Sequence, residues 1–158
     1  MTISSNVVGA HARNPLTTAN APRNLRRQAA RILIVDDSPE VVQILTSVLQ
    51  SVGYGVVASI TDPRGAVQVF ERFRPDLLVL DLSMPHLSGF DVMRALNDLV
   101  PRDQQCPILV LSGETDPSAK SLALASGAKD FLQKPVTMQE FLRRVDYHLA
   151  ACGGWLEA

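Results

Sequence analysis

The sequence predicts a doubly wound α/β fold, in which helices cover both faces of a five-stranded parallel sheet. From Arg31 onward, short apolar runs alternate with longer amphipathic segments, which is the pattern of a parallel sheet between two helical layers. The runs are rich in Val, Ile and Leu, as strands buried on both faces are. Capping residues mark the helix starts between them.

The apolar runs are short enough to be strands rather than helices. We expect strands at Arg31–Val35, Tyr54–Ile60, Leu77–Leu80, Pro107–Leu111 and Asp130–Leu132. Right-handed crossovers between such strands give a flavodoxin-like (βα)5 parallel sheet, for which we predict the strand order 2-1-3-4-5. In that architecture ligands bind outside the carboxyl ends of the strands.

The expected helices have recognisable first turns. A capping side chain precedes a proline suited to the first helical position at Ser38-Pro39, Asp62-Pro63 and Asp116-Pro117. Capping-box spacing occurs at Ser88 with Asp91 and at Thr137 with Glu140. The first helix is expected to bury an apolar stripe made of Val41, Ile44, Leu45, Val48 and Val52.

Composition excludes several classes of protein. The 46% hydrophobic and 20% charged content is ordinary for a soluble globular protein, and the net charge of −1 provides no field that attracts nucleic acid. Cys106 and Cys152 are too few for a disulfide or metal framework. No apolar run approaches the roughly 20 residues that span a bilayer. We therefore expect a cytoplasmic protein without a direct nucleic-acid or membrane partner.

The 158 residues leave room for one domain and a tail. Residues 1–31 contain five arginines and no acidic residue, and they show no helical or strand period. We expect a flexible basic N-terminal tail over residues 1–30 that contributes nothing to the core. The folded domain is expected over residues 31–151, followed by a short C-terminal tail over residues 152–158.

Polar side chains gather where the predicted strands end. Asp36 and Asp37 end the first strand, Asp81 ends the third and Ser112 the fourth, and Lys134 lies just beyond the fifth. Because the first and third strands are predicted neighbours, the three carboxylates would repel one another without a cation between them. Mg²⁺ fits best, since the available ligands are oxygens and neither His nor Cys is near.

Asp81 is the candidate nucleophile of this site. It stands alone after a buried strand and would project into the mouth of the site. A carboxylate can attack phosphorus to form an acyl phosphate when a metal and a lysine neutralise the incoming oxygens. Lys134 would supply the positive charge and Ser112 a hydroxyl donor. Asp36 and Asp37 are better suited to holding the metal.

Four motifs occur together at these strand ends. They are RILIVDD at Arg31–Asp37, LVLDLSMP at Leu78–Pro85 followed by Gly89, VLSG at Val110–Gly113, and KDFLQKP at Lys129–Pro135. In this order and spacing they resemble the response-regulator receiver family of two-component signalling, whose members are CheY-like. The resemblance covers roughly residues 31–151.

The resemblance implies a phosphorelay switch rather than an enzyme that acts on a metabolite. Asp81 would be the phosphoacceptor, with Mg²⁺ held by the side chains of Asp37 and Asp81 and by the backbone carbonyl of Ser83. Asp36 would assist through water. Ser112 and Lys134 would contact the phosphoryl group.

Further residues take roles from the same resemblance. Phe131 corresponds to the aromatic residue whose rotamer reports phosphorylation, and the Lys134-Pro135 bond is usually cis in the family. Ser83 and Glu114 lie where the family varies and where it tunes the lifetime of the phosphoryl group, so that lifetime stays open. Phosphorylation would change the surface formed by the fourth helix, the fifth strand and the fifth helix.

The resemblance also implies partners. The phosphoryl donor would be a sensor histidine kinase or a histidine phosphotransfer protein. No output domain follows Ala151, so we expect a separate protein effector unless the sequence is a fragment of a longer regulator. The kinase, the effector, the pathway and the formation of a homodimer stay open.

Three other functions compete with this interpretation. A haloacid-dehalogenase-like phosphatase also uses an aspartyl nucleophile and Mg²⁺, but it normally carries the nucleophile on the first strand, with a second Asp two residues later. A flavodoxin-like FMN carrier is disfavoured because Asp36 and Asp37 would repel the FMN phosphate. An interaction module that is never phosphorylated would not need the full set of site residues.

Overall fold

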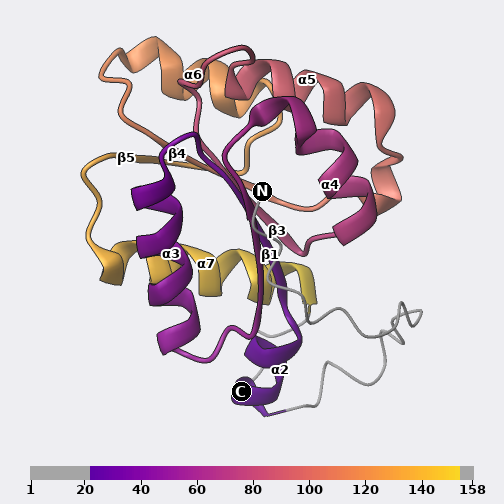
Figure 1. Ribbon diagram of the computed structural model, residues 1–158, viewed down its shortest axis with the longest axis vertical. Coiled ribbons are helices and arrows are strands. Elements are labelled where there is room, and N and C mark those ends of the chain that lie inside the picture. The colour runs from indigo at the N-terminus through magenta and orange to yellow at the C-terminus, as the bar shows by residue number, and fades with distance from the viewer. Residues whose placement is uncertain (1–21, 154–158) are drawn as a thin grey trace.

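The computed structural model describes residues 22–153 and contains the expected parallel sheet (Figure 1). Its strands are β1 (Arg31–Val35), β2 (Val56–Ile60), β3 (Leu77–Leu80), β4 (Ile108–Ser112) and β5 (Asp130–Gln133). They pair in the order β2-β1-β3-β4-β5. The predicted doubly wound topology is therefore confirmed, and β3 lies at the centre of the sheet.

Helices cover both faces of the sheet. They are α2 (Arg23–Ala29), α3 (Pro39–Ser51), α4 (Ala66–Phe73), α5 (Gly89–Leu99), α6 (Pro117–Ala125) and α7 (Met138–Gly153), with single 3-10 turns at Pro63–Gly65 and Arg102–Gln104. In Figure 1, α4, α5 and α6 lie on one side of the sheet and α3 and α7 on the other.

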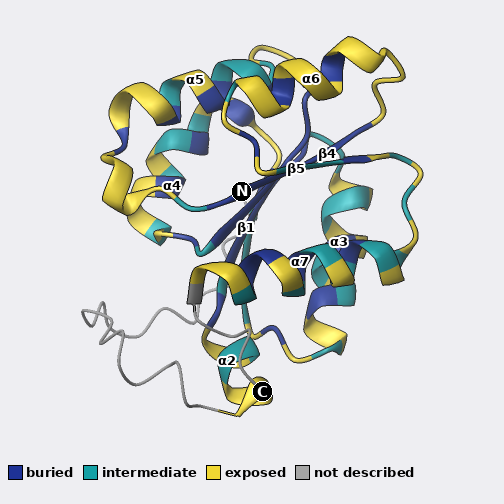
Figure 2. Ribbon diagram, turned by 180° about the vertical axis from the view of Figure 1, so that it is seen from behind, coloured by how far each residue is buried: buried dark blue, intermediate teal, exposed yellow. Residues whose placement is uncertain are grey.

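The apolar core is divided between these two faces. Phe70 of α4 and Met93 of α5 pack with Leu80 on one face, whereas Leu49 of α3 and Phe141 of α7 pack on the other. The central strands are buried almost throughout, as their dark blue ribbons in Figure 2 show. Burial on both sides explains why the strands read as continuous apolar runs.

Predicted caps begin several of the helices. Ser38 and Asp116 accept backbone hydrogen bonds in the first turns of α3 and α6, and Ser88 with Asp91 forms the reciprocal capping box of α5. Asp62 behaves differently from the prediction, because its side chain caps the 3-10 turn and α4 begins only after that turn.

The buried face of α3 is turned slightly from the predicted stripe. Leu45 and Leu49 are buried, whereas Ile44 is 53% exposed. Consecutive helical residues lie 100° apart, so Ile44 sits at the margin of any stripe centred on Leu45. The prediction that Ile44 is buried is wrong.

A helix that precedes β1 is bonded to the domain. Arg27 of α2 donates hydrogen bonds to both carboxylate oxygens of Asp146 on α7, at 2.6 and 3.3 Å, and to the carbonyl of Val52 after α3, at 2.9 Å. The Arg27 guanidinium also lies 5.5 Å from the ring centroid of Tyr54, whose hydroxyl donates to Asp146. Arg23 adds an ion pair to Asp146 at 2.7 Å.

Asp146 is the common partner in this network. Burial alone would raise the pKa of Asp146, but hydrogen bonds from Tyr54 and Arg27, together with the charges of Arg27 and Arg23, hold that pKa below its ordinary value. The carboxylate therefore stays ionised and joins α2, the end of α3 and α7.

The structure differs from the prediction of a flexible tail over residues 1–30. Residues 1–21 lie outside the described residues, but Arg23–Ala29 form α2. No residue of this helix is buried, so it carries no apolar stripe that a sequence pattern could reveal. At the other end, α7 continues to Gly153, two residues beyond the predicted boundary. Within residues 22–153, every helix is too short or too polar to cross a membrane.

We expect Arg27→Ala to lower the free energy of unfolding by about 1–3 kcal/mol, because Asp146 and Tyr54 lose a partly buried partner. Arg143→Ala is the matched control. Arg143 pairs with Glu140 on α7, but its side chain is 70% exposed, so its loss should change stability by less than about 0.5 kcal/mol. Urea denaturation measures both. Equal stability of the two variants would contradict anchoring through Arg27.

Candidate functional site

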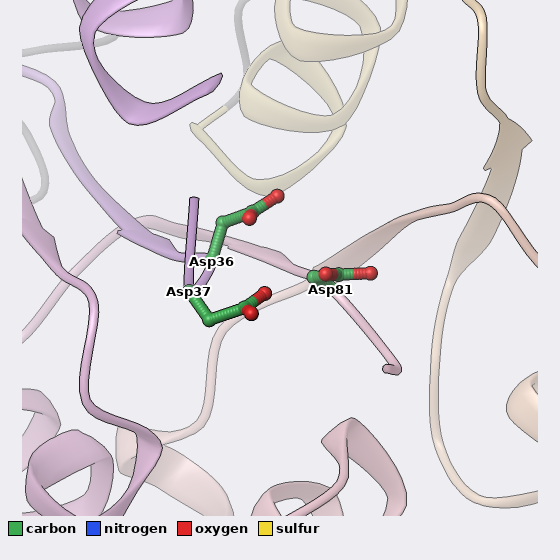
Figure 3. A group of neighbouring side chains, drawn as sticks. All are labelled: Asp36, Asp37 and Asp81. Atoms are coloured by element: carbon green, nitrogen blue, oxygen red, sulfur yellow. The ribbon is translucent and has the colours of Figure 1, made fainter. Parts of the chain in front are cut away.

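Three carboxylates converge where β1 and β3 end (Figure 3). Asp36 and Asp37 directly follow β1, and Asp81 directly follows β3. The parallel register pairs Val35 with Leu80, and the Asp81 N–H donates to the Val35 carbonyl at 2.9 Å. One oxygen from each carboxylate lies within 4.8 Å of the others. Such a group of oxygens suits a hard divalent cation.

Lys134 enters this cluster from the segment after β5. Its Nζ lies 2.8 Å from Asp36 Oδ2 and 3.8 Å from Asp81 Oδ2. Asp36 also accepts a hydrogen bond from the Ser38 N–H at 2.9 Å, which fixes its carboxylate. Asp36 and Asp81 are both buried, so their charges are poorly screened by water. The Lys134 ammonium therefore lies beside two of the three carboxylates, those of Asp36 and Asp81.

The pKa of Asp81 is raised by its surroundings. Burial, followed by the negative charge of Asp36, raises the pKa of Asp81 to about 6, against the opposing effects of Lys134 and of the Ser83 N–H. That N–H lies 3.4 Å from Asp81 Oδ1. Ionisation of Asp81 is thus less favourable than that of an ordinary aspartate.

An open depression of about 520 Å³ gives access to Asp81. It is lined by Asp81, Ser83, Gly113, Glu114, Thr115 and Lys134. Two of these lining residues are bonded to each other, since the Ser83 hydroxyl donates a hydrogen bond to Glu114 Oε1 at 2.7 Å. This contact joins the loop after β3 to the loop after β4, so both positions expected to vary in the family meet at the entrance.

Ser112 is not among the residues that line this depression. Its side chain is fully buried, its Oγ accepts a hydrogen bond from the Glu114 N–H at 3.2 Å, and its carbonyl accepts one from the Lys134 N–H at 2.8 Å. Phe131 is partly buried and packs on the core face covered by α4, α5 and α6. The Lys134-Pro135 bond is cis.

Comparison with known proteins decides the family. The family described as response regulator receiver domain matches residues 32–146. The chain belongs to this family. Among curated relatives, the DNA-binding response regulator MtrA of Mycolicibacterium smegmatis is 40% identical over 115 residues, which are 73% of this chain and 48% of that protein. The transcriptional regulatory protein KdpE of Mycobacterium tuberculosis is 38% identical over 114 residues, 72% of this chain and 48% of that protein.

Solved structures place the receiver domain in the same group. The chemotaxis protein CheY4 of Vibrio cholerae matches with a TM-score of 0.68 and 32% identity, over 75% of this chain and 98% of that chain. The BeF3-activated receiver domain of Klebsiella pneumoniae RstA matches with a TM-score of 0.68 and 28% identity, over 75% and 97%. The chain spans about half the length of the curated relatives it matches.

These matches confirm the predicted resemblance and the CheY-like fold. They leave the phosphatase and FMN-carrier alternatives without support, because the matched family and the fold are those of receivers. The sequence analysis missed two features of the site. Thr115 lines the depression, and nothing in its local pattern marks it. The Ser38 N–H orients the Asp36 carboxylate, whereas the sequence predicted only a helix cap at Ser38.

In metal-free protein, Asp81→Asn is expected to raise the melting temperature near pH 7, because the neutral amide removes the cost of burying a charged carboxylate and, second, its repulsion by Asp36. An unfolded Asp has a pKa of about 4, whereas Asp81 in the folded domain has a pKa of about 6. The folded state therefore binds more protons between these values, and ionisation of Asp81 costs stability as pH rises through that window. The advantage of the variant should be full above about pH 6 and vanish below about pH 4. Thermal melts in EDTA across this range measure it, and a gain that does not depend on pH would contradict the assignment.

Proposed function

We propose that this receiver domain accepts a phosphoryl group on Asp81 and thereby switches its affinity for another protein. One observation carries the proposal: a buried Asp81 lies beside Asp36 and Asp37 and within 3.8 Å of the Lys134 ammonium. That combination provides a nucleophilic oxygen, ligands for a divalent cation and a positive charge for the transferred group.

The residues fit Mg²⁺. The side chains of Asp37 and Asp81 and the backbone carbonyl of Ser83 would hold the ion, and Asp36 would act through water. Two observations support this fit. The three carboxylates each offer an oxygen within 4.8 Å of the others, and the positive charge of Lys134 does not balance their three negative charges. When bound, the ion would neutralise the carboxylates and the incoming phosphoryl oxygens.

The transfer step uses groups of this chain in defined roles. A carboxylate oxygen of Asp81 attacks the phosphorus of a phosphohistidine, a P–O bond forms, and the P–N bond breaks with its electron pair left on the imidazole nitrogen. Lys134 moves its ammonium from the carboxylates toward the phosphoryl oxygens, which carry the negative charge. Ser112 donates its hydroxyl to one of those oxygens.

Ser83 and Glu114 are proposed to tune how long the phosphoryl group persists. Their hydrogen bond of 2.7 Å joins two residues that line the depression together with Asp81. These side chains would affect the approach of the water that hydrolyses the acyl phosphate, so this contact would set part of the lifetime.

The switch is proposed to run from Ser112 to Phe131. Ser112 is the last residue of β4, and Phe131 lies on the adjacent strand β5, where it pairs with Val110. Movement of the Ser112 hydroxyl toward the phosphoryl group frees space into which Phe131 turns. That rotation changes the surface made by α6, β5 and α7, and a coupling of about 1–3 kcal/mol would change partner affinity about 5–150-fold.

The partners follow from the family rather than from the site. A sensor histidine kinase or a histidine phosphotransfer protein would be the donor, and a separate protein would be the effector. The DNA binding named for MtrA belongs to a protein about twice as long as the matched segment, and we propose no direct nucleic-acid or membrane contact for this domain. Its chemistry would be limited to its own phosphorylation and dephosphorylation, in the cytoplasm, as for receivers in general.

Acetyl phosphate with Mg²⁺ is expected to add one phosphoryl group to the purified protein, and Asp81→Asn is expected to abolish the adduct, because it removes the nucleophilic carboxylate. Intact-mass spectrometry measures both. EDTA should stop the reaction, and Asp37→Ala should slow it at least about 10-fold through loss of a metal ligand. Asp98→Asn, an exposed acid on α5, is the control and should react like wild type. An adduct that persists on Asp81→Asn would move the nucleophile elsewhere.

Ser112→Ala is expected to leave Asp81 phosphorylatable while weakening the switch. The substitution removes the hydroxyl that is proposed to move toward the phosphoryl group and donate a hydrogen bond to it. The measurement is the set of chemical-shift changes that beryllofluoride induces around Phe131 and along α6, β5 and α7. We expect these changes to fall to less than about half of the wild-type values. Unchanged shifts in the variant would show that Ser112 does not carry the coupling.

A further inference from the structure

We propose that Gly89 is a positioning residue for the phosphoacceptor, an inference that rests on the proposed function of Asp81. Gly89 is the first residue of α5 and lies against the Asp81–Leu82 peptide. A methyl carbon at this position would lie 2.3 Å from the Asp81 carbonyl oxygen and 2.9 Å from the Leu82 Cα. Carbon–oxygen contacts between backbones normally need about 3.3 Å, so any side chain here requires a shift of about 1 Å.

The contact is held from the Asp81 side. The Asp81 N–H is bonded to the Val35 carbonyl of the neighbouring strand at 2.9 Å. Leu82 is buried, and its carbonyl accepts the Gly89 N–H at 2.8 Å. Both atoms that a methyl group at Gly89 would strike hardest are backbone atoms, which cannot rotate away as the end of a side chain can.

The contact is also held from the helix side. Val92, Met93 and Leu96 fix α5 in the core. The capping box of Ser88 with Asp91 holds the first turn, with hydrogen bonds of 3.2 Å from the Asp91 N–H to Ser88 Oγ and 2.9 Å from the Ser88 N–H to Asp91 Oδ2. Because both sides of the contact are held, the clash cannot be relieved by α5 alone, and part of the shift falls on the Asp81–Leu82 peptide.

Displacement of that peptide moves the Asp81 carboxylate relative to Asp36 and Asp37. Metal affinity and reaction rate both depend on where the ligands and the nucleophile lie. A displacement of about 1 Å can lower the reaction rate about 100-fold. Because Gly89 has no side chain, the Asp81–Leu82 peptide can lie against α5, and this close approach sets the position of the Asp81 carboxylate.

The test compares Gly89→Ala with Gly65→Ala. Gly65 is the N-cap residue of α4, and a methyl carbon there meets nothing within 4 Å, so the control makes the same chemical change without the clash. Calorimetric titration with Mg²⁺ alone gives the affinity of the folded protein for the metal, and intact mass gives the phosphorylation rate with acetyl phosphate. Urea denaturation of each variant gives its stability separately.

We expect Gly89→Ala to bind Mg²⁺ about 10-fold or more weakly and to be phosphorylated about 10–100-fold more slowly, with Gly65→Ala unchanged in both. If Gly89→Ala is less stable but keeps wild-type Mg²⁺ affinity and rate when folded, Gly89 has only a structural role and the inference is overturned. If wild type itself is not phosphorylated, the proposed function fails instead.

Ser88→Ala provides a second route should Gly89→Ala fail to fold. It removes the cap without adding an atom and costs only about 1 kcal/mol of stability, yet it loosens the first turn that holds Gly89 against Asp81. We expect Mg²⁺ affinity to fall about two- to fivefold. If Gly89→Ala does not fold and folded Ser88→Ala binds Mg²⁺ with the affinity of wild type, the proposal is overturned.

Discussion

Repulsion among three carboxylates is the constraint on which the carboxyl edge of this sheet depends. Parallel pairing of β1 with β3 forces Asp36 and Asp81 to emerge side by side, and burial of both residues keeps water from screening their charges. Lys134 offsets only part of that charge, although it comes from the far end of the chain. The same pairing that builds the core therefore also gathers an excess of negative charge at this edge of the sheet.

The sequence was informative where one physical requirement dominates. Strands buried on both faces must be apolar, so all five were recognisable, and the strand order follows from right-handed crossovers. The convergence of Asp36 and Asp81 could be predicted because they follow neighbouring parallel strands, whose carboxyl ends must meet. Lys134 follows β5, which is separated from β3 by β4 but ends at the same edge of the sheet. Caps at Ser38 and Ser88 were equally readable, since each satisfies backbone groups of its own helix.

The remainder depends on contacts between segments that local patterns do not record. Ile44 looks as apolar as Leu45, and only the orientation of α3 against the sheet leaves it exposed. Helix α2 is held by charged side chains whose partner, Asp146, lies more than a hundred residues away. The Ser83–Glu114 hydrogen bond likewise joins two loops that meet only in the folded domain. The orientation of α3 and the partners of α2 and of Ser83 were therefore the parts of the fold and of the site that could not be predicted from the sequence.

The network at Asp146 has a mechanical consequence. Asp146 lies on α7, a helix of the proposed signalling surface, and it is bonded to Arg27 and Arg23 of α2, outside the segment that matches the receiver family. Arg27 is at the same time tied to the chain after α3 through Val52. A rotation of α7 must therefore either move α2 with it or break these hydrogen bonds. The position of α2 is thus coupled to the orientation of α7.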